Sequence, residues 1–445
     1  RVTLDNVDVT GNHGTYGGGL FIGGTAAVTL TNDCEVHQNT ASFAGGGAHV
    51  LGALTSMDTL SDINDNTAPH GGGVSAVGGQ LLLVEADMSG NRATDPAGRG
   101  GAIYLTEGAV VTMTGNVWLY NANQAYDGAA IYADSSEVFL GTATIGGNVA
   151  GNWGGGICLT NGSTLSASGA TVGSSVYPLG NQAARGAGIY ANSSTINFRG
   201  NVYNNTAAST GAGIYGEASI ITLTAAHVGG TGVNEANQLG PDGYTGVGLS
   251  LHSGTQATLN DTVISGNVFQ TAGFTYGGGA YVTGGTVLTL TTSSLESHVA
   301  PSVTDGRGAG IYASGSTVTL DDSDIVTNTA GTVGGGLRLF NGATLNILNN
   351  SQIVNNQALN AEGGAVAAGG ASDINIADAT LRENTAGGDG GAIYTDGGTL
   401  DFTGGWVLRQ NTAGANGGAV AAVGDAVASF TAGSYSLVYF NRAEG

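Results

Sequence analysis

Apolar and polar residues alternate in short segments along the whole chain. Examples are Val318 with Leu320 and, further on, Ile374 with Ile376, each pair separated by one polar residue. A period of two is typical of strands that bury one face. No stretch keeps a 3.6-residue period over ten residues. We therefore expect an all-β chain with almost no helix.

A glycine cluster followed by an aliphatic residue or alanine divides these segments into repeats. It occurs in forms such as GGGL, GAGI and GGAI, from Gly17 to Gly417, about 28 residues apart. Each repeat contains one segment after the glycines, one Thr-rich segment and one that ends in aliphatic-x-x-Asn. The pattern predicts a right-handed parallel β-helix (a β-solenoid) with three strands per coil and about 15–16 coils of roughly 28 residues. We expect residues 1–445 to form a single continuous β-helix that is a segment of a longer repeat array.

Glycine and asparagine recur at the predicted corners of the coils. Glycine fits corners that need a positive φ or a close backbone approach, and we expect one of these reasons at Gly335. Asparagine tolerates left-handed backbone, and stacked amides can hydrogen-bond along the axis. We expect Asn121 in this position in one coil, and His298 as a substituted corner in another. The predicted structural corner ladder includes Asn328, Asn356, Asn384 and Asn411.

A row of tyrosines follows the glycine corners, in the register that faces away from the predicted core. These tyrosines either stack and stabilise the sheet face or form a platform that binds sugars or a partner. In three consecutive coils, the loops after Asn237, Asn267 and His298 are long and are expected to form one contiguous ridge. The candidate partner- or glycan-binding residues are Tyr104, Tyr132, Tyr190, Tyr215, Tyr281 and Tyr312.

Composition and charge narrow the possible partners. The chain has 82 glycines in 445 residues, and ten basic residues against 32 acidic ones, a net charge of −22. Such a surface repels nucleic acid and anionic lipid.

The two cysteines, Cys34 and Cys158, lie at least four repeats apart, roughly 19 Å or more along the axis at ~4.8 Å per coil. A disulfide cannot span that distance.

Catalytic motifs are absent from the sequence. We find no nucleophile elbow, no phosphate-binding loop, no metal-ligand spacing and no calcium-binding nonapeptide repeat. Asp261, Asp322 and Asp378 share one register, two coils or about 10 Å apart, too wide for a retaining glycosidase pair. We therefore expect no catalytic residue and no cofactor, and a structural Ca²⁺ has no support in the sequence.

The segment from Asn384 to Tyr394, NTAGGDGGAIY, resembles the passenger regions of chlamydial polymorphic membrane proteins. It is also similar to large right-handed β-helix surface proteins of other bacteria. The resemblance implies a non-enzymatic extracellular protein at the cell surface, structural or adhesive, that forms a rod or fibre. Its expected partners are neighbouring copies or repeats of itself, and glycans or cell surfaces. The alternative function is a carbohydrate-active β-helix enzyme, a polysaccharide lyase or glycoside hydrolase.

Overall fold

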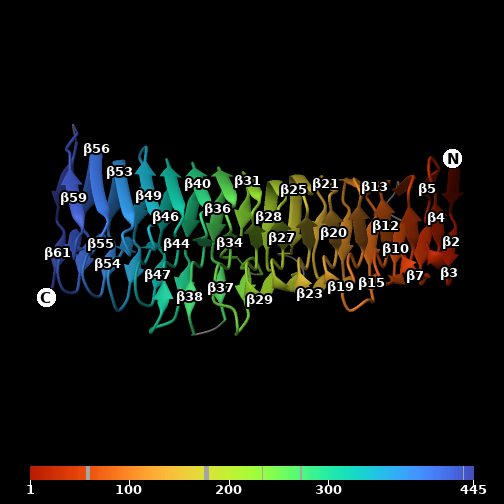
Figure 1. Ribbon diagram of the computed structural model, residues 1–445, viewed down its shortest axis with the longest axis horizontal. Helices are drawn as coiled ribbons and strands as arrows, with labels where there is room; N and C mark the ends of the chain where they lie inside the picture. Colours follow the sequence, from red (N-terminus) through yellow and green to blue (C-terminus); the bar gives the residue numbers. More distant parts are fainter. Residues whose placement is uncertain (57–60, 175–179, 233, 271–272, 434) are drawn as a thin grey trace. The chain divides into compact units, whose positions relative to one another are not determined.

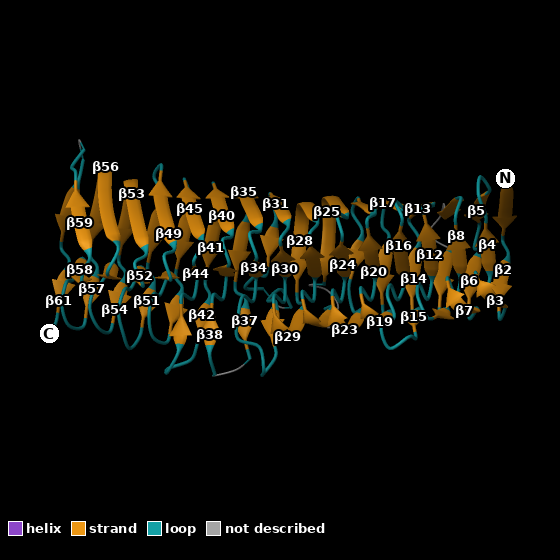
Figure 2. Ribbon diagram, in the orientation of Figure 1, coloured by secondary structure: helices purple, strands orange, loops and turns teal. Residues whose placement is uncertain are grey.

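The computed structural model describes residues 1–56, 61–174, 180–232, 234–270, 273–433 and 435–445. Throughout these ranges the chain consists of strands and loops, without a helix (Figure 2). It divides into two compact units. Unit 1 comprises residues 1–208, 212–215 and 232–235, and unit 2 comprises residues 209–211, 216–231 and 236–445. The expectation of one continuous β-helix over residues 1–445 stays a prediction.

One coil of unit 2 illustrates the architecture. It runs through β48 (Leu337–Phe340), β49 (Thr344–Leu348), β50 (Gln352–Val354) and the short β51 (Gln357–Ala358). β48 and β51 belong to two different sheets, whereas β49 and β50 belong to the third. Each coil thus adds one layer to three sheets, and β51 is a short strand that the sequence pattern did not predict.

Strands in the three large sheets pair in parallel with their counterparts one coil later. β45 (Thr317–Asp321) pairs with β49, which pairs with β53 (Asp373–Arg382), and β53 pairs with β56 (Thr399–Arg409) (Figure 1). Equivalent apolar residues stack in register and are fully buried: Val318, Leu345, Ile374 and Leu400. The predicted all-β parallel solenoid is therefore confirmed. The right-handed sense of the coiling stays a prediction.

Unit 1 repeats the same plan. A representative coil contains β16 (Ile103–Thr106), β17 (Val110–Thr114), β18 (Trp118–Tyr120) and β19 (Gln124–Asp127). β16 pairs in parallel with β12 (Val74–Val77) before it and with β20 (Ile131–Asp134) after it. The alternate residues Val111 and Met113 are buried between the sheets, as a period of two requires.

The glycine corner uses both properties of glycine at adjacent positions. Gly334 has a φ of +65°, where a side chain would be strained. Gly335 is not in this region. A Cβ atom on Gly335 would lie 2.5 Å from backbone atoms of Gln357 and 2.5 Å from the carbonyl oxygen of Gly364 in the next coil. Close approach of the coils, and not a positive φ, therefore requires glycine at position 335.

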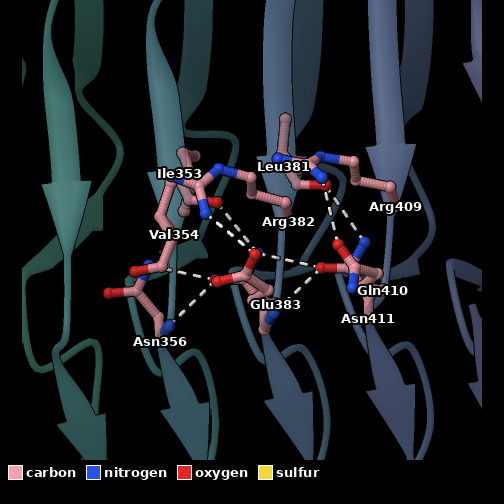
Figure 3. Close-up of polar contacts among 10 residues, drawn as sticks. Ile353, Val354, Asn356, Leu381, Arg382, Glu383, Arg409, Gln410 and Asn411 are labelled. Atoms are coloured by element: carbon pink, nitrogen blue, oxygen red, sulfur yellow. Dashed lines mark hydrogen bonds and ion pairs between the residues drawn. The ribbon is translucent and has the colours of Figure 1, made fainter.

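A buried asparagine ladder follows the opposite corner in unit 2. The Asn356 side chain donates to the carbonyl of Ile325 (2.8 Å) and to Oδ1 of Asn384 (3.1 Å). Figure 3 shows Asn356 and Asn411 two coils apart, joined by the contacts of the ladder residue between them. Each side chain also accepts a backbone N–H from the preceding coil, as Asn384 does from Asn356 (2.9 Å). Because every amide is satisfied within the chain, the structure assigns these asparagines to coil stacking.

In unit 1 the ladder differs from the prediction at one coil. Asn121 is exposed, and Asn123 occupies the ladder position, where it accepts from Asn91 (3.1 Å) and donates to Asn148 (2.9 Å). Here two consecutive residues, Asn121 and Ala122, have a φ of 47° and 63°, whereas other coils place one such residue before the asparagine. The prediction of Asn121 is wrong because this extra corner residue shifts the ladder position along the chain.

His298 replaces asparagine in the ladder of unit 2 and keeps its direction. It is fully buried, with Nδ1 2.9 Å from Oδ1 of Asn328 and Nε2 3.3 Å from Nδ2 of Asn267. An amide oxygen only accepts and an amide nitrogen only donates, so Nδ1 carries the proton and Nε2 accepts. Burial lowers the pKa of His298 to about 4. The imidazole is therefore a neutral link in the ladder at pH 7.

We expect His298→Asn to reduce the acid sensitivity of the fold. The folded-state pKa of His298 lies below its unfolded value of 6.5, so the unfolded chain binds the extra proton as the pH falls from 6.5 toward 4. This group should remove up to about 1.4 kcal/mol of stability per pH unit in that window. Urea midpoints at pH 7 and pH 4.5 measure the difference. His227 is exposed, so the His227→Asn variant is the control and should retain the wild-type pH dependence. The same change of the urea midpoint between pH 7 and pH 4.5 in all three proteins would contradict the prediction.

Both cysteines are free and buried. Cys34 lies in the core register, where its Sγ is 3.1 Å from the carbonyl of Leu4. Cys158 follows a glycine corner and is also fully buried. The expectation that they form no disulfide is confirmed.

Candidate functional site

Two rows of side chains flank the glycine corner along unit 1. We call the residue directly before each corner glycine the pre-glycine row, and the residue four positions after that glycine the post-glycine row. Strand pairing places successive members of each row on adjacent coils. The pre-glycine row is Tyr16, Ala44, His70, Arg99, Asp127, Trp153 and Arg185, and the post-glycine row is Phe21, His49, Ser75, Tyr104, Tyr132, Cys158, Tyr190 and Tyr215.

Four pre-glycine side chains pack on the post-glycine side chain of the next coil. The ring centroids of Trp153 and Tyr190 are 4.9 Å apart and nearly parallel. The guanidinium carbon of Arg99 lies 4.9 Å from the centre of the Tyr132 ring. Tyr190 also stacks on Tyr215 at 5.0 Å. These contacts combine aromatic stacking and cation–π attraction. Outside the core, they hold the chain before one glycine corner against the chain after the next.

This packing changes the interpretation of the predicted tyrosines in unit 1. Tyr132, Tyr190 and Tyr215 are 3%, 2% and 6% exposed, and Tyr104 is half-buried. Burial also raises the pKa of Tyr132 to about 12. The tyrosines point away from the core, but neighbouring side chains, among them Arg99 and Trp153 of the pre-glycine row, cover them. Of the two interpretations that the sequence left open, stacking and a binding platform, this burial favours stacking for these three residues.

The predicted tyrosines of unit 2 follow the same rule. Tyr281 is half-buried and stacks on the buried Tyr312 at 5.3 Å. The pre-glycine residue Tyr276 covers Tyr312 at 5.1 Å. Sequence reasoning missed the pre-glycine row, although aromatic residues and arginines directly before the glycine clusters were a readable signal.

The stack is interrupted at one coil of unit 1, where both rows have small residues. Ala44 stands in the pre-glycine row and Ser75 in the post-glycine row. A groove of about 530 Å³ opens there, within the usual range for ligand sites. Aromatic rings dominate its lining: Tyr16, Phe21, Phe43, His49, His70 and Tyr104. Phe21 and Phe43 are 58% and 53% exposed, so this aromatic groove presents rings to solvent.

The floor of the aromatic groove carries two unpartnered polar atoms. Ser75 Oγ and His49 Nδ1 are buried and form no hydrogen bond, and both residues line the groove. Burial lowers the pKa of His49 and of His70, so both imidazoles are neutral at pH 7. Buried polar atoms without partners are rare and costly. The groove is therefore uncharged and apolar, with unused hydrogen-bonding capacity at its base.

The long loops of unit 2 form the expected ridge in its described part. β38 (Thr275–Tyr276) pairs with β43 (Gly306–Arg307), and Thr245 bridges to Tyr276. The Tyr276 hydroxyl donates to Asp305, which also pairs with Arg307. The side chains of Tyr276, Asp305 and Arg307 thus bond to one another, whereas Tyr244 and Phe274 of the same ridge are 52% and 62% exposed.

The candidate carboxylates have a structural explanation. Asp261, Asp322 and Asp378 have φ values of 49°, 49° and 53°. Asp261 and Asp322 lie between two strands of one sheet, and Asp378 lies at the equivalent position inside the long strand β53. Asp378 accepts the backbone N–H of Gly405 (2.7 Å). Aspartate tolerates this left-handed conformation better than most residues. These residues thus shape the corner of the coil.

Comparison with known proteins yields one match. Residues 378–396 match the Chlamydia polymorphic membrane protein repeat, which confirms the resemblance noted for Asn384 to Tyr394. No curated protein and no solved structure matches the chain. The fold is a β-solenoid, and residues 378–396 of it are similar to this repeat. Within the described ranges, we find no group of three or more His, Cys, Asp or Glu residues that could hold a metal ion. In the same ranges, no helix is long and apolar enough to cross a membrane.

Proposed function

We propose that this chain is a non-enzymatic, extracellular structural or adhesive protein of a cell surface. The observation that carries the proposal is the aromatic groove of unit 1, which exposes Tyr16, Phe21 and Phe43 together. Exposed aromatic clusters mark interaction sites, because their burial against a partner is favourable. The repeat match at residues 378–396 supports surface display.

Two further observations support an adhesive over an enzymatic role. The candidate carboxylates occupy strained corners, as Asp322 does, and neighbours in their register are about 10 Å apart. The net charge of −22 disfavours binding of acidic polysaccharides.

Neighbouring copies or repeats of the chain are a second class of partner in this proposal. Strands β59 (Val427–Phe430) and β60 (Leu437–Tyr439) expose Val427, Phe430 and Leu437. An exposed strand with apolar side chains can pair with another strand.

Adhesion of protein-coated beads to cultured epithelial cells tests the proposal. We expect beads coated with the wild-type chain to adhere. The number of adhering beads should fall at least about fivefold for the double variant Phe21→Ser/Phe43→Ser, because aromatic contacts dominate most interfaces. Phe139→Ser changes an exposed aromatic residue outside the groove and should leave adhesion unchanged. Wild-type beads that do not adhere would contradict the proposal. Depolymerisation of a polysaccharide panel that is lost in Asp322→Ala would favour the enzymatic alternative instead.

A further inference from the structure

We propose that the aromatic groove contains a binding slot for a phenol ring, located above Ser75. The inference rests on the proposed function, because it takes this groove as the region that contacts a partner. It adds the chemistry of the bound group: a flat ring with one hydroxyl at its edge, either a free phenol or the side chain of a tyrosine.

The width of the slot follows from the strand register. Ser75 pairs with His49 on one side and with Tyr104 on the other. Adjacent strands are about 4.8 Å apart, so His49 and Tyr104 start about 9.6 Å apart. Rings on adjacent coils of this row stack at 5.6 Å (Phe21 on His49) and 5.7 Å (Tyr104 on Tyr132). The row between His49 and Tyr104 therefore lacks one ring, in the position that aromatic side chains fill in other coils, and the groove lies beside this position.

The floor of the slot fits one hydroxyl. Ser75 Oγ–H can donate, and the unpartnered Nδ1 of neutral His49 can accept. A phenol hydroxyl both accepts and donates, and it stays protonated at pH 7. One bound phenol would therefore satisfy both buried atoms without bringing a charge into an apolar site.

The lining favours a phenol over a sugar. His49 and Tyr104 flank the slot, and Phe21, Phe43 and Tyr16 line the rest of the same groove. A pyranose has hydroxyls around its whole edge, and each would lose hydration without a partner here. A phenol has two apolar faces and one polar point, which matches rings on the sides and two polar atoms below.

Unit 2 provides a matched position without this property. Ser250 lies in the post-glycine row of unit 2 and pairs with Tyr281. Its hydroxyl is 2.7 Å from Oγ1 of Thr210 and 2.8 Å from Nε2 of His252. Ser250 is therefore satisfied within the chain, whereas Ser75 is not.

Titration of the full chain with p-cresol, followed by saturation-transfer NMR, tests the slot. We expect a dissociation constant of roughly millimolar for so small a ligand. Toluene, which lacks the hydroxyl, should bind about tenfold more weakly. Methyl β-glucoside should not bind. N-acetyltyrosinamide in place of p-cresol tests whether a tyrosine side chain attached to a backbone also enters.

Three variants locate the binding. Ser75→Phe should fill the slot with the chain's own ring and abolish p-cresol binding. Ser75→Ala should keep the slot but remove the preference for p-cresol over toluene. Ser250→Ala, the control, should bind like the wild type. Circular dichroism establishes that each variant is folded, and Ser75→Ala decides the question if Ser75→Phe does not fold.

The outcomes separate the slot from the proposed function. Absence of p-cresol binding, or binding that Ser75→Ala and Ser75→Phe leave unchanged, overturns the slot, and adhesion by wild-type beads would still support the surface function. Binding of methyl β-glucoside that Ser75→Phe abolishes, without p-cresol binding, overturns the phenol and assigns the groove to sugars. Specific p-cresol binding by a chain that does not adhere would support the slot and refute adhesion.

Discussion

Gly335→Ala is expected to lower the free energy of unfolding by about 3 kcal/mol, a large effect for one methyl group. The new Cβ would lie 2.5 Å from the backbone of Gln357 and 2.5 Å from that of Gly364, and backbone atoms cannot move aside as a side-chain tip can. The neighbouring coil would have to shift, which weakens the bond from the Gly335 N–H to the carbonyl of Gly363 (3.2 Å). Urea unfolding measures the change.

Gly169→Ala is the matched control for this prediction. Gly169 lies in strand β25 (Thr164–Gly173), and its Cβ would meet nothing closer than the Thr142 methyl at 3.6 Å. We expect this variant to unfold like the parent. Deletion of residues 334–362, one whole repeat, should leave a shorter folded solenoid, because coils mainly contact their neighbours. A destabilised deletion together with an unaffected Gly335→Ala would contradict the stacked-coil explanation.

Asn384→Ala is expected to destabilise the chain by about 2–6 kcal/mol. The Asn384 side chain donates to the carbonyl of Ile353 (2.9 Å) and accepts the N–H of Asn356 (2.9 Å). Alanine leaves both groups buried without a partner, at about 1–3 kcal/mol each. Thermal and urea unfolding measure the loss.

An asparagine outside the core is the control for Asn384. Asn375 donates to Oδ1 of Asn346 (2.9 Å) on a partly exposed sheet face, so water can replace the lost bond. We expect Asn375→Ala to cost less than about 1 kcal/mol. Equal destabilisation by the two variants would contradict this prediction, because it would show that burial does not determine how much a ladder asparagine contributes to the free energy of unfolding.

The sequence by itself determined the fold class, because the information is local. Alternation at Val318 and Leu320 predicts a strand with one buried face, and its recurrence at Leu345 and Ile347 predicts stacking in register. Glycine at the corner also follows from local chemistry, since glycine accepts a positive φ. The left-handed residue at the opposite corner was misplaced by one position: it precedes the ladder asparagine and is Thr327 in one coil and Gln410 in another. The strand pairing and the fully buried side chain of Asn384 follow from the same pattern.

Only the tertiary structure decided which side chains are accessible. Tyr132 and Tyr190 face away from the core as their register requires, but Arg99 and Trp153 from the preceding coil cover them. This contact depends on the angle between the two arms at the glycine corner, which a period of two does not encode. The aromatic groove exists because the two small residues Ala44 and Ser75, from successive coils, occupy the two rows at this place. Pairing between strands, and not sequence proximity, brings these positions together.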